Sequence, residues 1–109
     1  MDRAARSWAV EQSIKHPQML RVGYFGSYAR GDWGVGSDLD LVVVVAEDDQ
    51  PFIQRGSRWD ASTLPVPTDV LVYTKAEWDQ LQAEGGRFAR MLREETVWLF
   101  ERESCHSAA

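Results

Sequence analysis

Apolar residues recur along the chain with two different spacings, which predict a mixture of helices and strands. From Asp2 to Lys15 the spacing is helical, and His16-Pro17 would end that helix. Ala5, Trp8, Ala9 and Gln12 fall on one side of this helix, and the charged residues lie elsewhere. From Leu20 to Phe25 apolar residues alternate with others, which predicts a strand that ends at Gly26.

Three further strands follow from the same reasoning. They are Asp38 to Ala46, which contains the unbroken apolar run Leu41 to Val45, then Thr68 to Tyr73 and Thr96 to Phe100. Ser27 to Arg30 is expected to form a short helix that Gly31 breaks, and residues 32–37 a loop. Residues 47–67 are polar and rich in turn formers. They predict mostly loop, with one helical turn near Phe52 and Ile53, in a segment that can vary without harming the core.

Two helices are predicted before the last strand. Thr74 and Glu77 form a capping-box pattern that opens a helix to about Glu84, and Gly85-Gly86 ends it. The second runs from about Arg87 to Glu94, with Phe88, Met91 and Leu92 at core spacing. This order of elements predicts an α+β fold with a mixed sheet flanked by helices. We expect one domain over residues 1–103 and a flexible C-terminal tail over 104–109.

Candidate chemistry gathers where the second strand begins. Asp38 and Asp40 lie two residues apart, so both would project from one face of that strand. Carboxylates beside a long aliphatic run are costly unless they are paired, hydrogen-bonded or bound to metal. The Gly26-Ser27 turn can aim backbone N–H groups and a hydroxyl at phosphate oxygens. Acidic ligands for a divalent cation and a phosphate-binding turn together indicate nucleotide chemistry.

The segment from Gly26 to Leu41 resembles the signature of the DNA-polymerase-beta-like nucleotidyltransferase superfamily. It reads Gly-Ser-Tyr-Ala-Arg-Gly and, after a gap of the family's size, Ser-Asp-Leu-Asp-Leu. The likeness is to the minimal nucleotidyltransferase (MNT) domains found in HEPN/MNT toxin-antitoxin pairs, and it covers about Leu20 to Phe100. That family carries a third Asp on a later strand, and Asp69 is the match.

The resemblance implies the nucleotidyltransferase fold, with a small, largely antiparallel mixed sheet, and a set of site residues. Asp38, Asp40 and Asp69 would be catalytic and would hold Mg²⁺. Gly26, Ser27 and Arg30 would bind the phosphates of the donor, which is expected to be ATP. The chain would then transfer AMP to a hydroxyl of a partner protein, as an antitoxin that modifies a HEPN-domain toxin.

Two other classes of function stay open at this point. One is a nucleotidyltransferase for small molecules, similar to those that modify aminoglycosides, and the other is a non-catalytic antitoxin that blocks its partner sterically. Arg30 fits a surface charge as well as it fits a phosphate contact. Asp69 also has an alternative interpretation, as a solvated residue at the start of a strand. The sequence does not name the base, the acceptor or the oligomeric state, so both homo- and hetero-oligomers remain possible.

Composition narrows the classes of partner. The chain has 109 residues and a net charge of -5, from 12 basic and 17 acidic residues, which argues against binding a long nucleic acid. Its single cysteine, Cys105, cannot form an internal disulfide, and no apolar run approaches the roughly 18 residues of a membrane span. We therefore expect a cytoplasmic protein. Five tryptophans suggest a partner-binding patch, with four outside the motif: Trp8, Trp59, Trp78 and Trp98.

Overall fold

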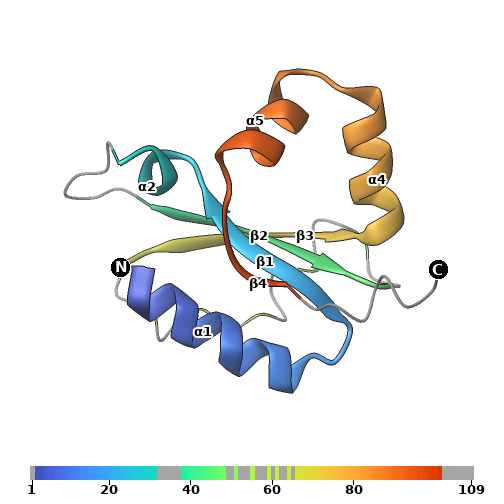
Figure 1. Cartoon of the computed structure of the whole chain (residues 1–109). Helices are drawn as coiled ribbons and strands as arrows, with labels where there is room; N and C mark the ends of the chain where they lie inside the picture. The colour runs from blue at the N-terminus through green and yellow to red at the C-terminus, as the bar shows by residue number, and fades with distance from the viewer. Residues whose placement is uncertain are drawn as a thin grey trace.

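The fold is a four-stranded sheet between helices, as seen in the computed structural model of the chain (Figure 1). The structure describes residues 2–31, 38–48, 51, 55, 59, 61, 64 and 66–101. The helices and strands of this part are α1 (Asp2–Lys15), β1 (Met19–Phe25), α2 (Ser27–Arg30), β2 (Leu39–Val45), β3 (Thr68–Thr74), α4 (Lys75–Glu84), α5 (Arg87–Glu95) and β4 (Val97–Glu101).

The strand order in the sheet is β3-β2-β1-β4. The central strand β1 is antiparallel to both β2 and β4, whereas β2 and β3 run parallel. A parallel pair needs a long crossover, and residues 46–67 supply it. The sheet is therefore mixed, which confirms the predicted α+β class.

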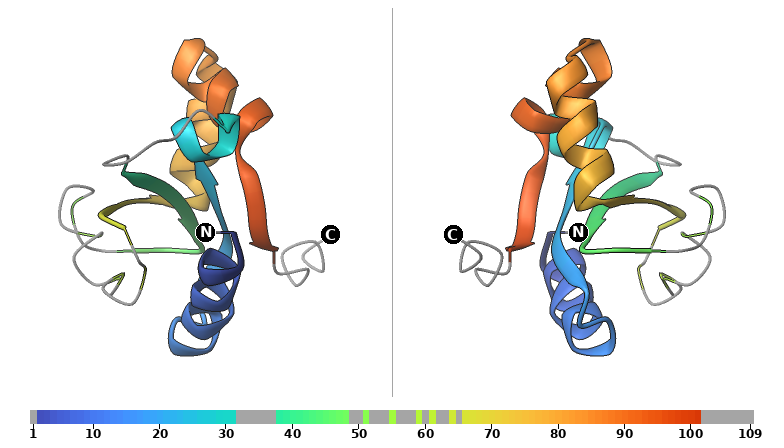
Figure 2. Two further views of the ribbon diagram at one scale, coloured as in Figure 1. Left: turned by 90° about the vertical axis from the view of Figure 1, so that its left-hand side faces the viewer. Right: turned by 90° about the vertical axis from the view of Figure 1, so that its right-hand side faces the viewer.

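Alternation along β2 gives the sheet two buried faces. Leu39, Leu41 and Val43 pack into a core that includes Trp8 and Ala9 of α1. Val42 and Val44 point the other way, into a second core with Trp78 of α4 and Leu92 of α5. Figure 2 shows the resulting layers, with α1 on one side of the sheet and α4 and α5 on the other. Because both faces are covered, β2 is apolar without interruption after Asp40.

The helix and strand ends predicted from the sequence mostly agree with the structure to within one residue. The helix α1 has the predicted bounds, and all four of its predicted inward residues are buried: Ala5, Trp8, Ala9 and Gln12. The capping box at α4 is present, since Glu77 N–H donates to Thr74 Oγ1 at 3.2 Å and Thr74 N–H donates to Glu77 Oε1 at 3.0 Å. One boundary differs at the motif, because β2 begins at Leu39 and Asp38 lies just before it.

Two predictions about aromatic residues are wrong. Phe88 is 42% exposed and is not a core residue, because its ring lies at the rim of the second core while Ala89 and Leu92 fill the buried side of α5. The four tryptophans outside the motif do not form an exposed patch either; Trp98 is half-buried, and Trp33 lies outside the described residues. Trp8, Trp59 and Trp78 are buried, since the apolar layers on both sides of the sheet use them as packing.

The segment between β2 and β3 is more closely tied to the core than the sequence indicated. Arg55, Trp59 and Leu64 are buried. The Arg55 guanidinium donates to the backbone carbonyl of Val72 at 3.2 Å and to both carboxylate oxygens of Glu77. This hydrogen bonding lowers the pKa of Glu77 below its usual range. The expectation that the whole segment can vary without harming the core is therefore wrong.

Some predictions fall on residues that the structure does not describe. These are the loop over 32–37, the helical turn near Phe52 and Ile53, and the C-terminal tail over 104–109. Among the helices that are described, none is long and apolar enough to cross a membrane.

Candidate active site

Two of the predicted acidic residues lie side by side at one end of the sheet. Asp40 and Asp69 are each the second residue of their strand, and their Cα atoms are register partners in the parallel β2·β3 pair. Leu39 and Leu41 point into the core on the α1 side, so Asp40 projects toward the α5 side. Asp40 is half-buried and Asp69 is exposed. The chain thus brings a pair of carboxylates from separate segments to one face.

The third acidic residue, Asp38, approaches the pair from outside the strand and is exposed. Its charge nevertheless acts on Asp40. Burial raises the pKa of the Asp40 carboxyl above its ordinary value of 3.8, the carboxylates of Asp69 and Asp38 raise it further, and Arg30 lowers it. Both other carboxylates therefore act on Asp40, and the Arg30 guanidinium opposes them.

Gly26 brings the turn after β1 against the Asp40 carboxylate. The residue has a φ of +79°, a left-handed conformation that glycine adopts readily. A Cβ atom placed on it would lie 2.6 Å from Asp40 Oδ2, well inside any ordinary contact. Only a residue without a side chain allows the backbone and the carboxylate to be this close. The predicted phosphate-binding turn and the predicted metal ligand are thus direct neighbours.

The short helix α2 continues from this turn. Its first turn is closed by Arg30 N–H, which donates to the carbonyl of Gly26 at 3.1 Å. Arg30 is exposed and lies close enough to lower the pKa of Asp40, while its guanidinium Nη1 is 3.7 Å from Glu95 Oε1 at the end of α5. The backbone of Ser27 begins α2, but the prediction for its hydroxyl lies outside the described side chains.

The donor set suits a hard divalent cation that also binds phosphate. Within the described residues, no three His, Cys, Asp or Glu side chains lie close enough to hold a metal ion by themselves. Mg²⁺ in nucleotide sites is typically held by one or two carboxylates, with the remaining ligands from phosphate and water. The Asp40–Asp69 pair fits that requirement, and the raised pKa of Asp40 marks negative charge that a cation would neutralise.

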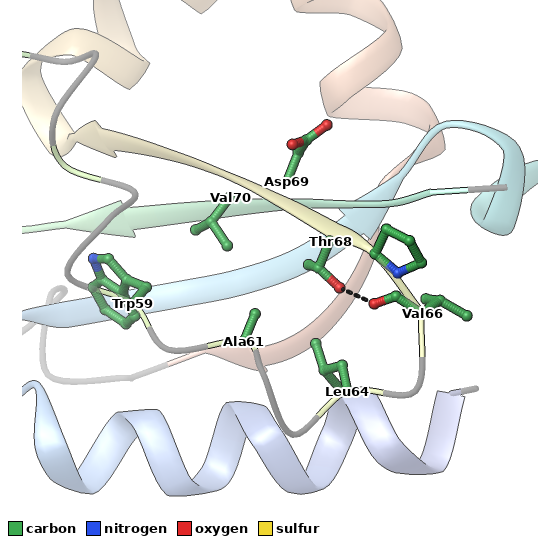
Figure 3. A pocket seen from close by; sticks show the side chains of 8 residues that line it. Trp59, Ala61, Leu64, Val66, Thr68, Asp69 and Val70 are labelled. Atoms are coloured by element: carbon green, nitrogen blue, oxygen red, sulfur yellow. Dashed lines mark hydrogen bonds between the residues drawn. The ribbon is translucent and has the colours of Figure 1, made fainter. Parts of the chain in front are cut away.

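A cavity of about 550 Å³ lies beside β3, next to the carboxylates but on the other side of the strand (Figure 3). Its lining consists of Trp59, Ala61, Leu64, Val66, Pro67, Thr68, Asp69 and Val70. In Figure 3 the Asp69 carboxylate points away from Ala61 and Leu64, which lie toward α1. The cavity therefore borders the acidic site without containing it.

Sequence reasoning missed two residues next to the site. Glu95 pairs with Arg30, and Phe88 lies on the α5 side near the end of β1, where its ring contacts Phe25. The helical spacing of α5 placed Phe88 in the core, and no local pattern links Glu95 to Arg30 across 65 positions. Both contacts depend on how α5 lies over the sheet.

Comparison with known proteins identifies the fold and the family. A model of the nucleotidyltransferase domain matches residues 10–99. The chain belongs to this nucleotidyltransferase family. Asp40, Asp69 and Gly26 all lie within the matched region. No curated protein sequence matches the chain.

Solved structures share the fold at low sequence identity. A structure from Sulfolobus solfataricus, assigned as a nucleotidyltransferase, is 24% identical with a TM-score of 0.66, and the match covers 94% of this chain and 82% of that one. A toxin-antitoxin structure with AMP-PNP is 17% identical with a TM-score of 0.62, covering 94% and 78%. A complex of tri-AMPylated HEPN toxin from Shewanella oneidensis with MNT antitoxin is 16% identical with a TM-score of 0.57, covering 99% and 79%.

Proposed function

We propose that this nucleotidyltransferase moves AMP from ATP to a hydroxyl of a partner protein, and that the partner is a HEPN-domain toxin. The observation that carries the proposal is the in-register Asp40–Asp69 pair beside Gly26. Carboxylates next to a turn that leads into a helix suit a metal-bound triphosphate. The structural neighbours with AMP-PNP and with an AMPylated HEPN toxin support the choice of donor and acceptor.

Each site residue has a distinct part in this reaction. Asp40 and Asp69, with Asp38 beside them, would hold Mg²⁺, which would neutralise charge on the triphosphate and on the leaving pyrophosphate. Gly26, Ser27 and Arg30 bind and orient the phosphates. The acceptor oxygen attacks the α-phosphorus, the bond to the bridging oxygen of pyrophosphate breaks, and the hydroxyl proton leaves toward Asp69. The products are an AMP ester of the acceptor and pyrophosphate.

The remaining expectations about the cell and the assembly belong to the same proposal. A chain that acts on an intracellular toxin works in the cytoplasm and forms at least a transient hetero-oligomer with it. The partner also forms part of the substrate site, because the acceptor oxygen belongs to it. A long nucleic acid is not among the proposed ligands, given the net charge of -5.

The test uses the chain purified with its co-expressed partner, Mg²⁺, and ATP labelled at either the α- or the γ-phosphate. We expect α-label on the partner and none from γ-labelled ATP. Asp40→Asn should abolish the transfer, whereas Asp79→Asn is a matched control because Asp79 lies on α4, paired with Lys75 at 2.9 Å. Transfer of γ-label would indicate a kinase. Inhibition of the partner that persists in Asp40→Asn without any label would indicate steric blocking.

A further inference from the structure

Phe88 is an exposed aromatic ring on the same side of the sheet as the carboxylates. It is 42% exposed, and the other exposed large apolar residues among those described, Val10 and Ile14, lie on α1 across the sheet. The Phe88 ring meets Phe25 edge-to-face, with centroids 6.2 Å apart and an interplanar angle of 82°. Phe25 itself is buried. Packing on Phe25 therefore holds Phe88 in place and leaves much of its surface open to solvent.

The position of Phe25 connects this ring to the acidic site. Phe25 is the last residue of β1, and its Cα is the register partner of Asp40. Register partners in an antiparallel pair point to the same face, so the side chains of Phe25 and Asp40 are neighbours. The Phe25 side chain thus contacts Phe88 and lies beside Asp40. Figure 1 shows α5, which carries Phe88, above this end of β1.

On the side of the sheet that carries the carboxylates, β3 is only partly covered. Asp69 is exposed, and Leu71, the next residue on the same face of β3, is only half-buried although it is apolar. In Figure 3 the Asp69 carboxylate points away from the α1 side of the sheet. A nucleotide whose phosphates contact the Asp40 carboxylate and the Gly26 turn can extend past Phe25 to Phe88.

We propose that Phe88 is the stacking surface for the base of the donor nucleotide. This inference rests on the proposed function, which places the triphosphate at Gly26, Asp40 and Asp69. Every base has a flat face that stacks on an aromatic ring, and stacking contributes to affinity without strict selection of the base. Larger purine rings cover more of Phe88 than pyrimidines do, so ATP and GTP should bind more tightly than CTP and UTP.

The experiment compares two ligands, Mg²⁺–ATP and Mg²⁺–tripolyphosphate, by equilibrium binding to the full chain purified with its co-expressed partner. We expect Phe88→Ala to weaken ATP binding about 10-fold, equivalent to about 1.4 kcal/mol, and to leave tripolyphosphate binding unchanged. Phe88→Trp keeps an aromatic face and should stay within about 3-fold of the wild type. Ile14→Ala is the matched control, because Ile14 is also an exposed apolar residue but lies on α1.

Three outcomes would overturn the inference. The first is an unchanged affinity for ATP in Phe88→Ala. If that variant also loses its binding to the partner, Phe88 belongs to the protein interface instead. Equal weakening of ATP and tripolyphosphate would show that the substitution disturbs the phosphate site. A wild-type chain that binds neither ligand would overturn the proposed function itself, which distinguishes that failure from a failure at Phe88 alone.

Discussion

Replacing Gly26 by alanine should destabilise the chain for two separate reasons. The first is the backbone conformation, because a φ of +79° costs a residue with a Cβ atom about 1 kcal/mol. The second is the neighbour, because the new Cβ would lie 2.6 Å from Asp40 Oδ2. Ordinary contact begins at 3.4 Å, so the carboxylate must retreat by about 0.8 Å. Moving a side chain off its preferred rotamer costs about 0.5–1.5 kcal/mol.

Gly31 provides the control for the backbone part. It also has a φ of +79°, but nothing lies within 4 Å of the Cβ that an alanine would add there. Gly31→Ala should therefore lower the free energy of unfolding by about 1 kcal/mol, and Gly26→Ala by about 2 kcal/mol. For a domain of this size the difference corresponds to about 4–8 °C in Tm. Transfer activity should fall at least about 100-fold in Gly26→Ala, since displacement of Asp40 disturbs the metal site.

A thermal-unfolding cycle with Asp40→Ala measures the contact directly. When the carboxylate is absent, Gly26→Ala should cost no more than Gly31→Ala, so the two substitutions at Gly26 and Asp40 couple by about 1 kcal/mol. Equal costs for Gly26→Ala in the presence and absence of the Asp40 carboxylate would refute the account of the close approach. Full activity in Gly26→Ala would refute the role assigned to it.

Three further predictions concern stability. Asp40→Asn should raise the Tm by about 2–5 °C at pH 7, because it removes a carboxylate whose charged form is disfavoured in the folded chain. The pKa of Asp40 is raised in the folded chain, so this gain in Tm should shrink in thermal scans as the pH falls through that pKa toward 3.8. Arg55→Met should lower the free energy of unfolding in urea by about 2–3 kcal/mol, a value below that of a fully buried pair because Glu77 is 44% exposed. Glu77→Gln should lower the free energy of unfolding by about 1 kcal/mol above pH 4.5, and this loss relative to the wild type should disappear as the pH falls through the lowered pKa of Glu77. A loss that stays constant with pH would contradict the pairing of Glu77 with Arg55.

Local sequence signals were sufficient to predict the helices and strands and the face of the sheet from which Asp40 projects. Helical spacing in α1, the capping box at Thr74 and the turn at Gly26 each depend on residues a few positions apart. The alternation of β2 also placed Asp40 on one face correctly. The family match over residues 10–99 confirms the recognition that the motif gave.

Features that depend on contacts between distant segments were not predictable in this way. The Arg55–Glu77 pair joins residues 22 positions apart, and nothing near Arg55 marks it as a buried residue. Phe88 has the spacing of a core residue, but the buried side of α5 carries Ala89 and Leu92 and leaves Phe88 at the rim. The approach of Gly26 to Asp40 requires the antiparallel register of β1 and β2, in which Phe25 faces Asp40.

The hydrogen bond from Arg55 to Val72 has a consequence for association between molecules. In the described sheet β3 is the outermost strand on its side, and a free strand edge can pair with a strand from another chain. The guanidinium of Arg55 occupies the Val72 carbonyl on that edge, and a planar cation cannot template a further strand. Removal of Arg55 would free this carbonyl, so we expect cells that express an Arg55 variant to accumulate insoluble chain even at temperatures where the monomer remains folded.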